Sequence, residues 1–395
     1  MAQEVAADLA VLGQEFARDP YRLFARLRAR GPVQRVRTPT GRQVWLVLGH
    51  AEARAALADP RLVKSAPGAT DELDSRLDRH LLAVDPPDHT RLRRLVTREF
   101  TARRVAALEP RVREITTGLL DAMLAHPGRR ADLVAALSFP LPMTVICELL
   151  GVPELDREQF RAWSDTLTSA TPPEQQAATV PLVRAYLAEL IEAKRHRPGD
   201  DLLSALIATA DEAGDRLSPD ELLGMAWLLL VAGHETTVNL ITNGTLALLT
   251  HPDQLALLRR EPSLLANAVE EMLRYDGPVP TPTLRFTREP TLIAGTLVPA
   301  GEVVLPVIAD ANRDPGVFPE PERFDITRET RGHLSFGHGI HHCLGAPLAR
   351  LEARVAFEEL LARAPGLALD LPSSELLSWR VGMLIRGPLS LPVRW

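Results

Sequence analysis

The residue types with the greatest chemical potential lie in one glycine-rich segment of ten residues. It reads Phe336-Gly337-His338-Gly339-Ile340-His341-His342-Cys343-Leu344-Gly345. A cysteine thiolate is a good ligand for haem iron, because it donates electron density that favours O–O cleavage. The glycines would let the chain turn tightly and pass close to a flat cofactor. We expect a helix directly behind this segment, with Pro347 in its first turn, whose N-terminus stabilises the sulfur and lowers the pKa of Cys343.

Two other interpretations of Cys343 are available. A free cysteine is more often an inert, buried residue, but that interpretation leaves three glycines and His341 unexplained. A zinc site from His338, His341, His342 and Cys343 has suitable ligand types. Four ligands packed within six residues would nevertheless form a poor tetrahedral cage, so we favour the haem ligand.

A second group of reactive side chains lies inside an expected long helix over 219–249. Ser218 and Glu221 form a capping box around Pro219, and the apolar residues that follow lie nearly all round the helix. About 30 residues would span roughly 45 Å through the interior. In its middle stands Ala232-Gly233-His234-Glu235-Thr236-Thr237. A buried carboxylate is costly unless it is paired or functional; the alternative is a locally amphipathic patch.

Basic residues at helical spacing form further candidates. Glu271 and Arg274 stand at i and i+3, which alone indicates no more than a surface ion pair. His89 and Arg93 share one face of a helix that we expect to begin after two prolines and two acids. The two haem propionates require cationic or N–H donors. Each of these basic residues taken singly, Arg285 included, favours a solvated face, and only their occurrence together favours the cofactor.

Together these motifs resemble those of the cytochrome P-450 monooxygenases, from about residue 85 to the C-terminal strand. The resemblance implies an oxygen-binding groove at Gly233, with Thr236 as hydrogen-bond donor and Glu235 as proton carrier. It implies a structural cluster of Glu271, Arg274 and an arginine from the segment 311–325, where Arg323 is the candidate. The cofactor-binding residues that it implies are His89, Arg93, Gly233, Arg285, Phe336, His341, Cys343 and Gly345, with Cys343 as the metal ligand.

Composition sets limits on the class of protein. A net charge of −6 and a pI near 6.0 argue against a nucleic-acid partner. We find no basic-then-apolar leader and no run of about 18 apolar residues, and we expect a soluble, cytoplasmic protein without a membrane partner. Cys147 and Cys343 do not define a disulfide framework. Lys64 and Lys194 are the only lysines, so 43 of the 45 basic residues are arginine, which indicates the codon bias of a high-GC genome.

The expected fold is mainly α with a small β region, in one domain over 1–395. The pattern predicts a helix over 16–28, hairpin strands over 33–37 and 44–48, and a helix over 51–58. A loop over 63–72 follows, helical periodicity dominates 90–274, and short strands follow 285. The family resemblance implies a triangular α-helical prism with a long central helix over the haem.

The activity implied by the resemblance is O₂-dependent monooxygenation, in which R–H, O₂, two electrons and two protons give R–OH and water. The implied cofactor is haem b (iron protoporphyrin IX), and the implied donor is a ferredoxin with its NAD(P)H-dependent reductase, serving a monomer. We expect the ferredoxin to dock near Arg103, Arg104 and Arg350. A peroxygenase is disfavoured by Glu235 and Thr236, and a haem-binding sensor without turnover is the alternative outside the enzymes.

The substrate is the least constrained part of the function. The segments expected to touch it are 63–84, 160–180, 227–232, 279–284 and 382–384, which are apolar with scattered acids at Asp71, Glu72 and Asp74. They favour a large, mostly hydrophobic molecule, with room for a cationic amino sugar. The chain most resembles enzymes that hydroxylate or epoxidise macrolides and other polyketides in antibiotic biosynthesis; terpenes, steroids and fatty acids are the alternatives.

Overall fold

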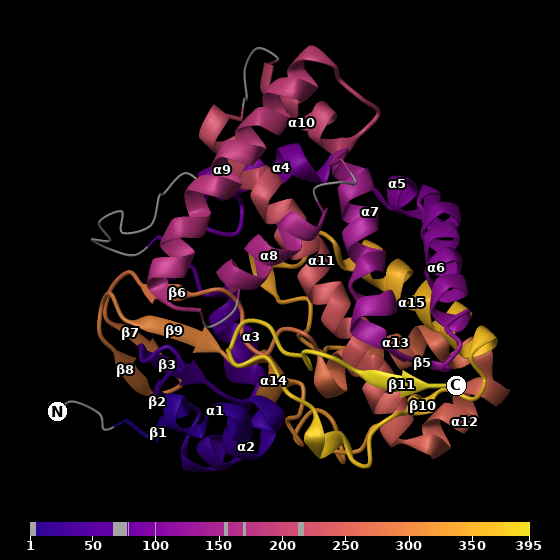
Figure 1. The fold of residues 1–395 in the computed structure, drawn as a ribbon. Coiled ribbons are helices and arrows are strands. Elements are labelled where there is room, and N and C mark those ends of the chain that lie inside the picture. The colour runs from indigo at the N-terminus through magenta and orange to yellow at the C-terminus, as the bar shows by residue number, and fades with distance from the viewer. Residues whose placement is uncertain are drawn as a thin grey trace.

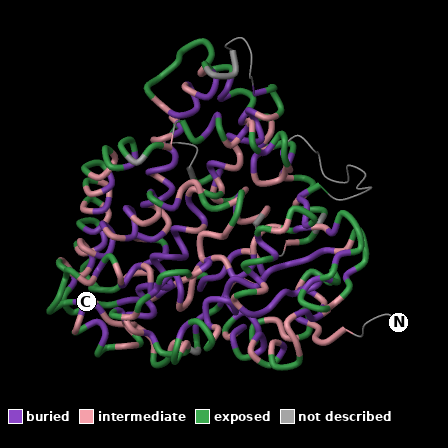
Figure 2. The backbone as a smooth tube through the Cα atoms, turned by 180° about the vertical axis from the view of Figure 1, so that it is seen from behind, coloured by how far each residue is buried: buried purple, intermediate pink, exposed green. Residues whose placement is uncertain are grey.

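The computed structural model describes residues 5–65, 77, 79–98, 100–153, 157–168, 171–211 and 217–395. Helices dominate this part of the chain, and the outline is roughly triangular (Figures 1 and 2). The helices are α1 (Leu9–Arg18), α2 (Pro20–Arg30), α3 (His50–Ala58), α4 (Asp88–Thr97), α5 (Ala102–Ala107), α6 (Glu109–Leu124), α7 (Pro140–Leu150), α8 (Arg157–Thr168), α9 (Pro173–His196), α10 (Leu202–Asp211), α11 (Pro219–Thr250), α12 (Pro252–Arg260), α13 (Leu265–Asp276), α14 (Ile308–Ala311) and α15 (Ala346–Arg363). Among the described residues, none of these helices has both the length and the apolar character needed to cross a bilayer.

The main sheet combines strands from both ends of the sequence. Its order is β1-β2-β3-β9-β6-β4, and a second sheet has the order β10-β11-β5, while β7 and β8 pair alone. The strands are β1 (Ala7–Asp8), β2 (Val33–Arg37), β3 (Gln43–Val47), β4 (Leu62–Val63), β5 (Arg130–Asp132), β6 (Arg285–Thr287), β7 (Thr291–Ile293), β8 (Thr296–Val298), β9 (Val303–Pro306), β10 (Ala368–Leu369) and β11 (Pro392–Arg394). The antiparallel β4–β6 pair places Val63 opposite Phe286. It therefore brings the segment after residue 63 beside Arg285.

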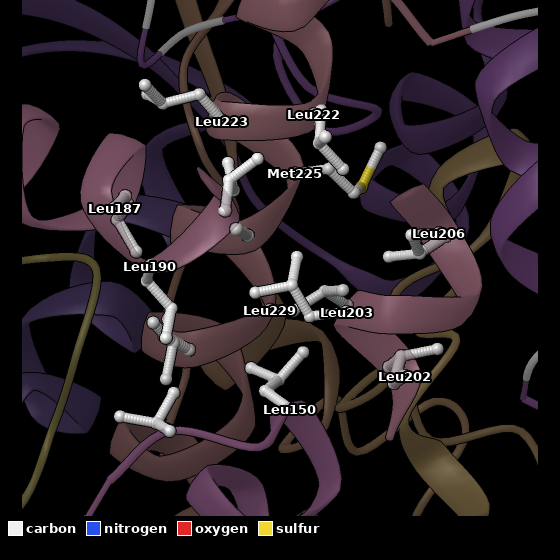
Figure 3. Packing of buried hydrophobic residues seen from close by; sticks show 14 of the residues in the cluster. Leu150, Leu187, Leu190, Leu202, Leu203, Leu206, Leu222, Leu223, Met225 and Leu229 are labelled. Carbon is white, nitrogen blue, oxygen red and sulfur yellow. The ribbon is translucent and has the colours of Figure 1, made fainter. Parts of the chain in front are cut away.

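Helix α11 runs through the centre of the molecule (Figure 1). Its capping box is formed as predicted, because Ser218 Oγ accepts from the Glu221 N–H and the Glu221 carboxylate accepts from the Ser218 N–H. Leucines from α9 and α10 surround its first turns, and Figure 3 shows Leu187, Leu203 and Leu229 in this layer. The helix cannot move without disturbing this core, so the residues in its middle have a fixed position.

Most predicted elements are confirmed, but the first helix is not. The hairpin, the helix near 51–58 and the central helix occur within about two residues of the predicted bounds. The predicted helix over 16–28 is wrong: Asp19 has φ −139° and ψ 81°, and it separates α1 from α2. A residue before proline is disfavoured in the α region, and Pro20 follows. The strand β5 also interrupts the predicted helical stretch, and most of the predicted 63–72 loop lies outside the described residues.

Candidate active site

A cavity of about 390 Å³ lies between α11 and the glycine-rich loop. Ala232, Gly233 and Thr236 are accessible from it, although most of α11 after Leu222 is buried. The volume lies within the range of small-molecule sites. The wall is largely apolar and includes Leu81, Leu82, Trp227, Val231, Val279 and Leu384.

The glycine-rich loop turns sharply against helix α3. Gly337 and Gly339 adopt left-handed backbone, with φ of 74° and 76°. A Cβ on Gly339 would lie 3.2 Å from Ala58 Cα, so a side chain there would press against the backbone of α3. The N–H of Cys343 donates to the Phe336 carbonyl at 2.8 Å, which closes the loop and directs the cysteine into the cavity.

The electrostatics of Cys343 differ from the sequence-based expectation. Burial raises the pKa of the thiol, and the N–H groups of Gly345 and Ala346 and the Arg93 guanidinium oppose that rise only in part. The predicted net lowering of the pKa is therefore wrong, although the predicted N–H donors are present. A coordinated metal ion would itself deprotonate the thiol.

The zinc interpretation is not supported by the arrangement of the side chains. Throughout the described ranges, no three His, Cys, Asp or Glu side chains are placed to hold one metal ion. The cavity-lining His338, His341, His342 and Cys343 therefore do not form a closed tetrahedral site.

Basic side chains converge beside the loop at one part of the cavity. The rings of His89 and His341 meet edge to face with centroids 4.5 Å apart. Arg93 donates to the His342 carbonyl at 2.7 Å, and Arg285 is buried on β6. The structure thus brings together the four residues predicted to hold the propionates.

The cluster of basic side chains beside the loop contains more positive than negative charge. Both ring nitrogens of His89, Nε of Arg285 and Nδ1 of His341 are buried without a hydrogen-bond partner. Burial and then the neighbouring Lys64 lower the pKa of His341 to about 2. Buried donors without acceptors are costly, and a ligand with two carboxylates would relieve the cost. The residues therefore fit haem, with its sulfur ligand and its propionate donors in one cavity.

Lys64 is a member of the cluster that the sequence interpretation missed. Its Nζ donates to the Thr283 carbonyl and Oγ1 at 3.0 and 2.6 Å and to the Leu284 carbonyl at 3.1 Å. Burial and then Arg285 lower its pKa to about 7. The composition contains a signal for Lys64. In a chain that otherwise uses arginine, a lysine indicates a position that needs a compact ammonium group.

Thr236 and Glu235 both line the cavity from α11, but their side chains have different hydrogen-bond partners. Thr236 Oγ donates to the Ala232 carbonyl at 3.0 Å and faces the cavity. Glu235 is buried, and its carboxylate accepts from Ser164 Oγ at 2.7 Å. Burial acts to raise the pKa of Glu235, but His234, Arg380 and Ser164 outweigh it and lower the pKa to about 2. Glu235 and Thr236 are adjacent in the helix, but the groups that hold the Glu235 carboxylate are Ser164, His234 and Arg380.

Gly233 is explained by helix packing. A Cβ there would lie 2.6 Å from two carbon atoms of Ile146 on α7. Its missing side chain therefore permits close contact between α7 and α11, while its backbone also lines the cavity. The structure gives the glycine a packing role that the sequence interpretation did not include.

The predicted structural cluster forms, with one correction. Arg274 binds Glu271 through two hydrogen bonds, at 2.6 and 2.8 Å, and both side chains are fully buried. Arg323 contributes only its carbonyl, 3.3 Å from Arg274 Nη2, and its own side chain is largely exposed beside Glu320. The predicted place of the Arg323 side chain is therefore wrong. Arg328 lies there instead, 3.4 Å from Glu271.

The predicted substrate segments line the cavity with one exception. The ranges 63–84, 227–232, 279–284 and 382–384 all contribute residues to its wall, whereas no described residue of 160–180 does. Phe160 packs against Trp163 and Tyr186 instead, so the prediction is wrong for the described residues of this range, and 169–170 lie outside them. The acids Asp71, Glu72 and Asp74 lie outside the described residues.

The fold, the buried cationic cluster and the cysteine loop define a haem-thiolate enzyme, and the comparisons agree. The cytochrome P-450 family model matches residues 174–363. The chain is 58% identical over 391 residues to the cytochrome P-450 monooxygenase PikC of Streptomyces venezuelae, covering 98% of this chain and 94% of that protein. The chain belongs to the cytochrome P-450 family and is a monooxygenase.

Other relatives cover nearly the whole chain. Identity is 50% to the vitamin D(3) 25-hydroxylase of Pseudonocardia autotrophica, over 96% of this chain and 94% of that protein. It is 48% to the 6-deoxyerythronolide B hydroxylase of Saccharopolyspora erythraea, over 95% and 96%. Among solved structures, a tirandamycin C-bound monooxygenase, TamI, superposes with a TM-score of 0.88 at 44% identity, covering 98% of this chain and 99% of that one. The predicted fold class is confirmed.

Proposed function

We propose that this monooxygenase hydroxylates or epoxidises a macrolide or another large polyketide intermediate of antibiotic biosynthesis. The similarity to a 6-deoxyerythronolide B hydroxylase over nearly the full length of both chains carries the proposal. The largely apolar wall of the cavity supports it, because such a surface suits a bulky ligand with few polar groups. The similarity to a vitamin D(3) 25-hydroxylase favours vitamin D(3) as the second candidate.

A binding screen tests the substrate class. We expect polyketide lactones to shift the Soret absorption of the holoenzyme at micromolar concentration. Vitamin D(3), terpenes and fatty acids serve as the comparison panel. A neutral lactone and its amino-sugar derivative, compared directly, test the suggested cationic group. A shift with vitamin D(3) or fatty acids alone would overturn the polyketide assignment.

We assign the cofactor contacts to the cationic cluster and to Cys343. Haem b, when bound, supplies the activation of O₂ and the two-electron chemistry of the oxidation. Cys343 would hold its iron, and His89, Arg93, Arg285 and His341 would hold its carboxylates. Lys64 joins this set, because its ammonium group lies in the same cavity wall.

The chain's own contribution to catalysis is the control of protons and water. Thr236 on α11 lines the cavity, and its hydroxyl donates to the Ala232 carbonyl of the same helix. A hydroxyl has one proton, so Thr236 would turn it from the Ala232 carbonyl towards a ligand in the cavity. Glu235, one residue earlier, would then relay protons towards it.

Replacing Thr236 with alanine is expected to uncouple the reaction. Product formed per reductant should fall about tenfold, because the substitution removes a positioned proton donor. Reductant consumption should continue and yield peroxide. Thr245→Ala is the matched control: its hydroxyl makes the same contact on α11, to the Ile241 carbonyl at 2.8 Å, and it does not line the cavity. Equal yields in the Thr236 variant and the wild type would contradict the role.

The electron donor in this proposal is a ferredoxin with its NAD(P)H-dependent reductase. Arg103 and Arg104 are exposed on α5, which packs on α15 behind the cysteine loop. Arg350 is less suitable than expected, because it donates to Glu270 at 2.6 and 2.9 Å and stacks over Phe336. We therefore centre the docking face on Arg103 and Arg104.

Charge reversal tests this face. Arg103→Glu with Arg104→Glu should slow reduction by the ferredoxin roughly tenfold at low ionic strength, and added salt should narrow the difference. Arg42→Glu, on the exposed β2–β3 turn, is the control and should have no effect. Unchanged reduction kinetics in the double variant would move the docking face elsewhere.

We further propose that residues 1–395 form one domain and act as a cytoplasmic monomer. The main sheet supports the first point, since it joins strands near residue 45 to strands near residue 304. Size-exclusion chromatography of the holoenzyme tests the second.

A further inference from the structure

One side of the cavity wall consists of two segments that are far apart in the sequence, 278–283 and 382–385. The residues of both segments that line the cavity are mostly apolar: Pro278, Val279, Pro282, Thr283, Leu384 and Ile385. Neither segment belongs to a regular strand, so no continuous ladder of hydrogen bonds joins the two. The shape of this wall therefore depends on the individual contacts that fix the turn at 382–385.

The C-terminal end of this turn is held firmly at Arg386. The Arg386 guanidinium is buried, and it donates to the Asp276 carboxylate at 2.6 Å and to the Arg18 carbonyl at 3.0 Å. The backbone carbonyl of the same residue accepts from Asn243 Nδ2 on α11 at 3.1 Å, and its N–H donates to the Pro278 carbonyl at 2.9 Å. These contacts with α1, α11 and α13 fix the point at which the turn joins the core.

The tip of the turn is held through one atom, the carbonyl oxygen of Met383. Thr281 donates to this oxygen twice, from its backbone N–H at 3.2 Å and from its hydroxyl at 2.8 Å. Residues 382–385 all lie in the described part of the chain, and within that part they make no other hydrogen bond. A Cβ on Gly382 would meet no atom within 4 Å, so the position next to Met383 has open space around it.

Thr281 can influence a ligand only through this turn. Its side chain is 1% exposed, and it does not line the cavity itself. Leu384 follows Met383 directly, so the place of Leu384 in the wall depends on the carbonyl that Thr281 holds. Because an apolar wall has few polar groups to orient a bulky ligand, its shape decides which part of the ligand is presented for oxidation.

We propose that Thr281 is a positioning residue that selects the site of oxidation on the substrate, because its hydroxyl holds the Met383 carbonyl and thereby Leu384 in the cavity wall. Without the hydroxyl, the anchor at Arg386 keeps the turn folded, but Leu384 can take a wider range of positions. The substrate can then bind in more than one orientation. The proposal rests on the proposed oxidation of a large, mostly hydrophobic molecule.

Replacing Thr281 with valine removes the hydroxyl and nearly keeps the shape of the side chain. The ratio of the main oxidised product to its positional isomers should fall about fivefold, which corresponds to the loss of one hydrogen bond. The summed rate of oxidation should stay close to that of the wild type. Thr281→Ser keeps the hydroxyl and should restore the wild-type ratio. Thr281→Ala, which adds no bulk, gives the same test if the Thr281→Val chain does not fold.

Thr287→Val is the matched control for the loss of a buried hydroxyl. Thr287 on β6 is fully buried, its hydroxyl donates to the Pro299 carbonyl at 2.5 Å, and it does not line the cavity. This substitution should lower Tm at least as much as Thr281→Val does and leave the product ratio unchanged. An equal change of the ratio in the control would mean that any loosening of the fold has this effect, and it would overturn the inference.

Amide hydrogen exchange of the holoenzyme tests the contact without any substrate. The N–H of residue 281 should exchange about fivefold faster in Thr281→Val than in the wild type, because the turn that carries its acceptor opens more often. The Arg386 N–H belongs to the separate anchor and should keep its exchange rate. Thr281→Ser should restore the slow exchange at residue 281.

The outcomes separate this inference from the proposed substrate class. An unchanged product ratio in Thr281→Val, or an unchanged exchange rate at residue 281, would overturn the inference. The ratio is measured on whichever compound the binding screen identifies, so failure of the polyketide assignment leaves the test intact. The exchange experiment uses no substrate and reports on the contact between Thr281 and Met383 alone.

Discussion

Replacing Cys343 with alanine is expected to abolish oxygenation. Cys343 supplies the sulfur in the cavity wall, and no other described cysteine lines the cavity. Without the thiolate, the ferrous–CO complex should lose its strongly red-shifted Soret band, and product formation should fall to background. Haem binding itself should persist in part, because the cationic cluster that faces the propionates is untouched.

Cys147→Ala is the matched control for this prediction. Cys147 is fully buried on α7, where its sulfur contacts Met143 at 3.6 Å. Removing it should leave the spectrum and activity intact and cost about 1 kcal/mol of stability through a small cavity. A normal red-shifted band in the Cys343 variant would show that another residue binds the iron.

Replacing Arg274 with alanine should cause the largest loss of stability. Besides its two bonds to Glu271, Arg274 donates to the carbonyls of Asn312 and Pro321 at 2.9 and 3.0 Å. Its removal leaves a fully buried carboxylate without its partner, which costs about 3–5 kcal/mol. Thermal or denaturant unfolding of the holoenzyme measures the loss, and haem retention should fall with it.

Arg323→Ala provides the comparison, because only the carbonyl of that residue contacts Arg274, while its side chain lies 3.7 Å from Glu320 and from Asp325. Its exposed side chain should change stability by no more than about 0.5 kcal/mol. A large loss in the Arg323 variant would restore the side-chain role expected from the sequence. A small loss in the Arg274 variant would mean that Glu271 finds compensation, for which Arg328 is the nearest candidate.

Local patterns in the sequence predicted the parts of the site that depend on short-range order. Three of these patterns act within a few residues: the capping box at Ser218, the apolar character of α11 and the proline behind the cysteine loop. The structure confirms the helix that each of them predicts. The break at Asp19 was also a local signal, but the apolar spacing around it favoured a continuous helix.

The sequence pattern does not predict contacts between residues that are far apart in the chain. Lys64 meets Thr283 across 219 positions, and Arg380 meets Asp165 across 215. Apart from the rarity of lysine in this chain, the local sequence does not separate such residues from solvated ones, because their burial depends on the assembled sheet and helices. Arg323 shows a related limit of prediction from sequence. The family resemblance places Arg323 beside Arg274, but it does not predict that the Arg323 carbonyl makes the contact.

The sheet that joins both ends of the chain also sets an order for folding. The pair between β3 and β9 aligns Trp45 with Val304, and β4 cannot pair until β6 has been made. Contacts between such distant segments form late and slowly. Lys64 and Arg285 therefore come together only after most of the chain has left the ribosome. We expect newly made protein to remain unable to hold haem tightly until then, so cofactor capture would mark the completion of folding.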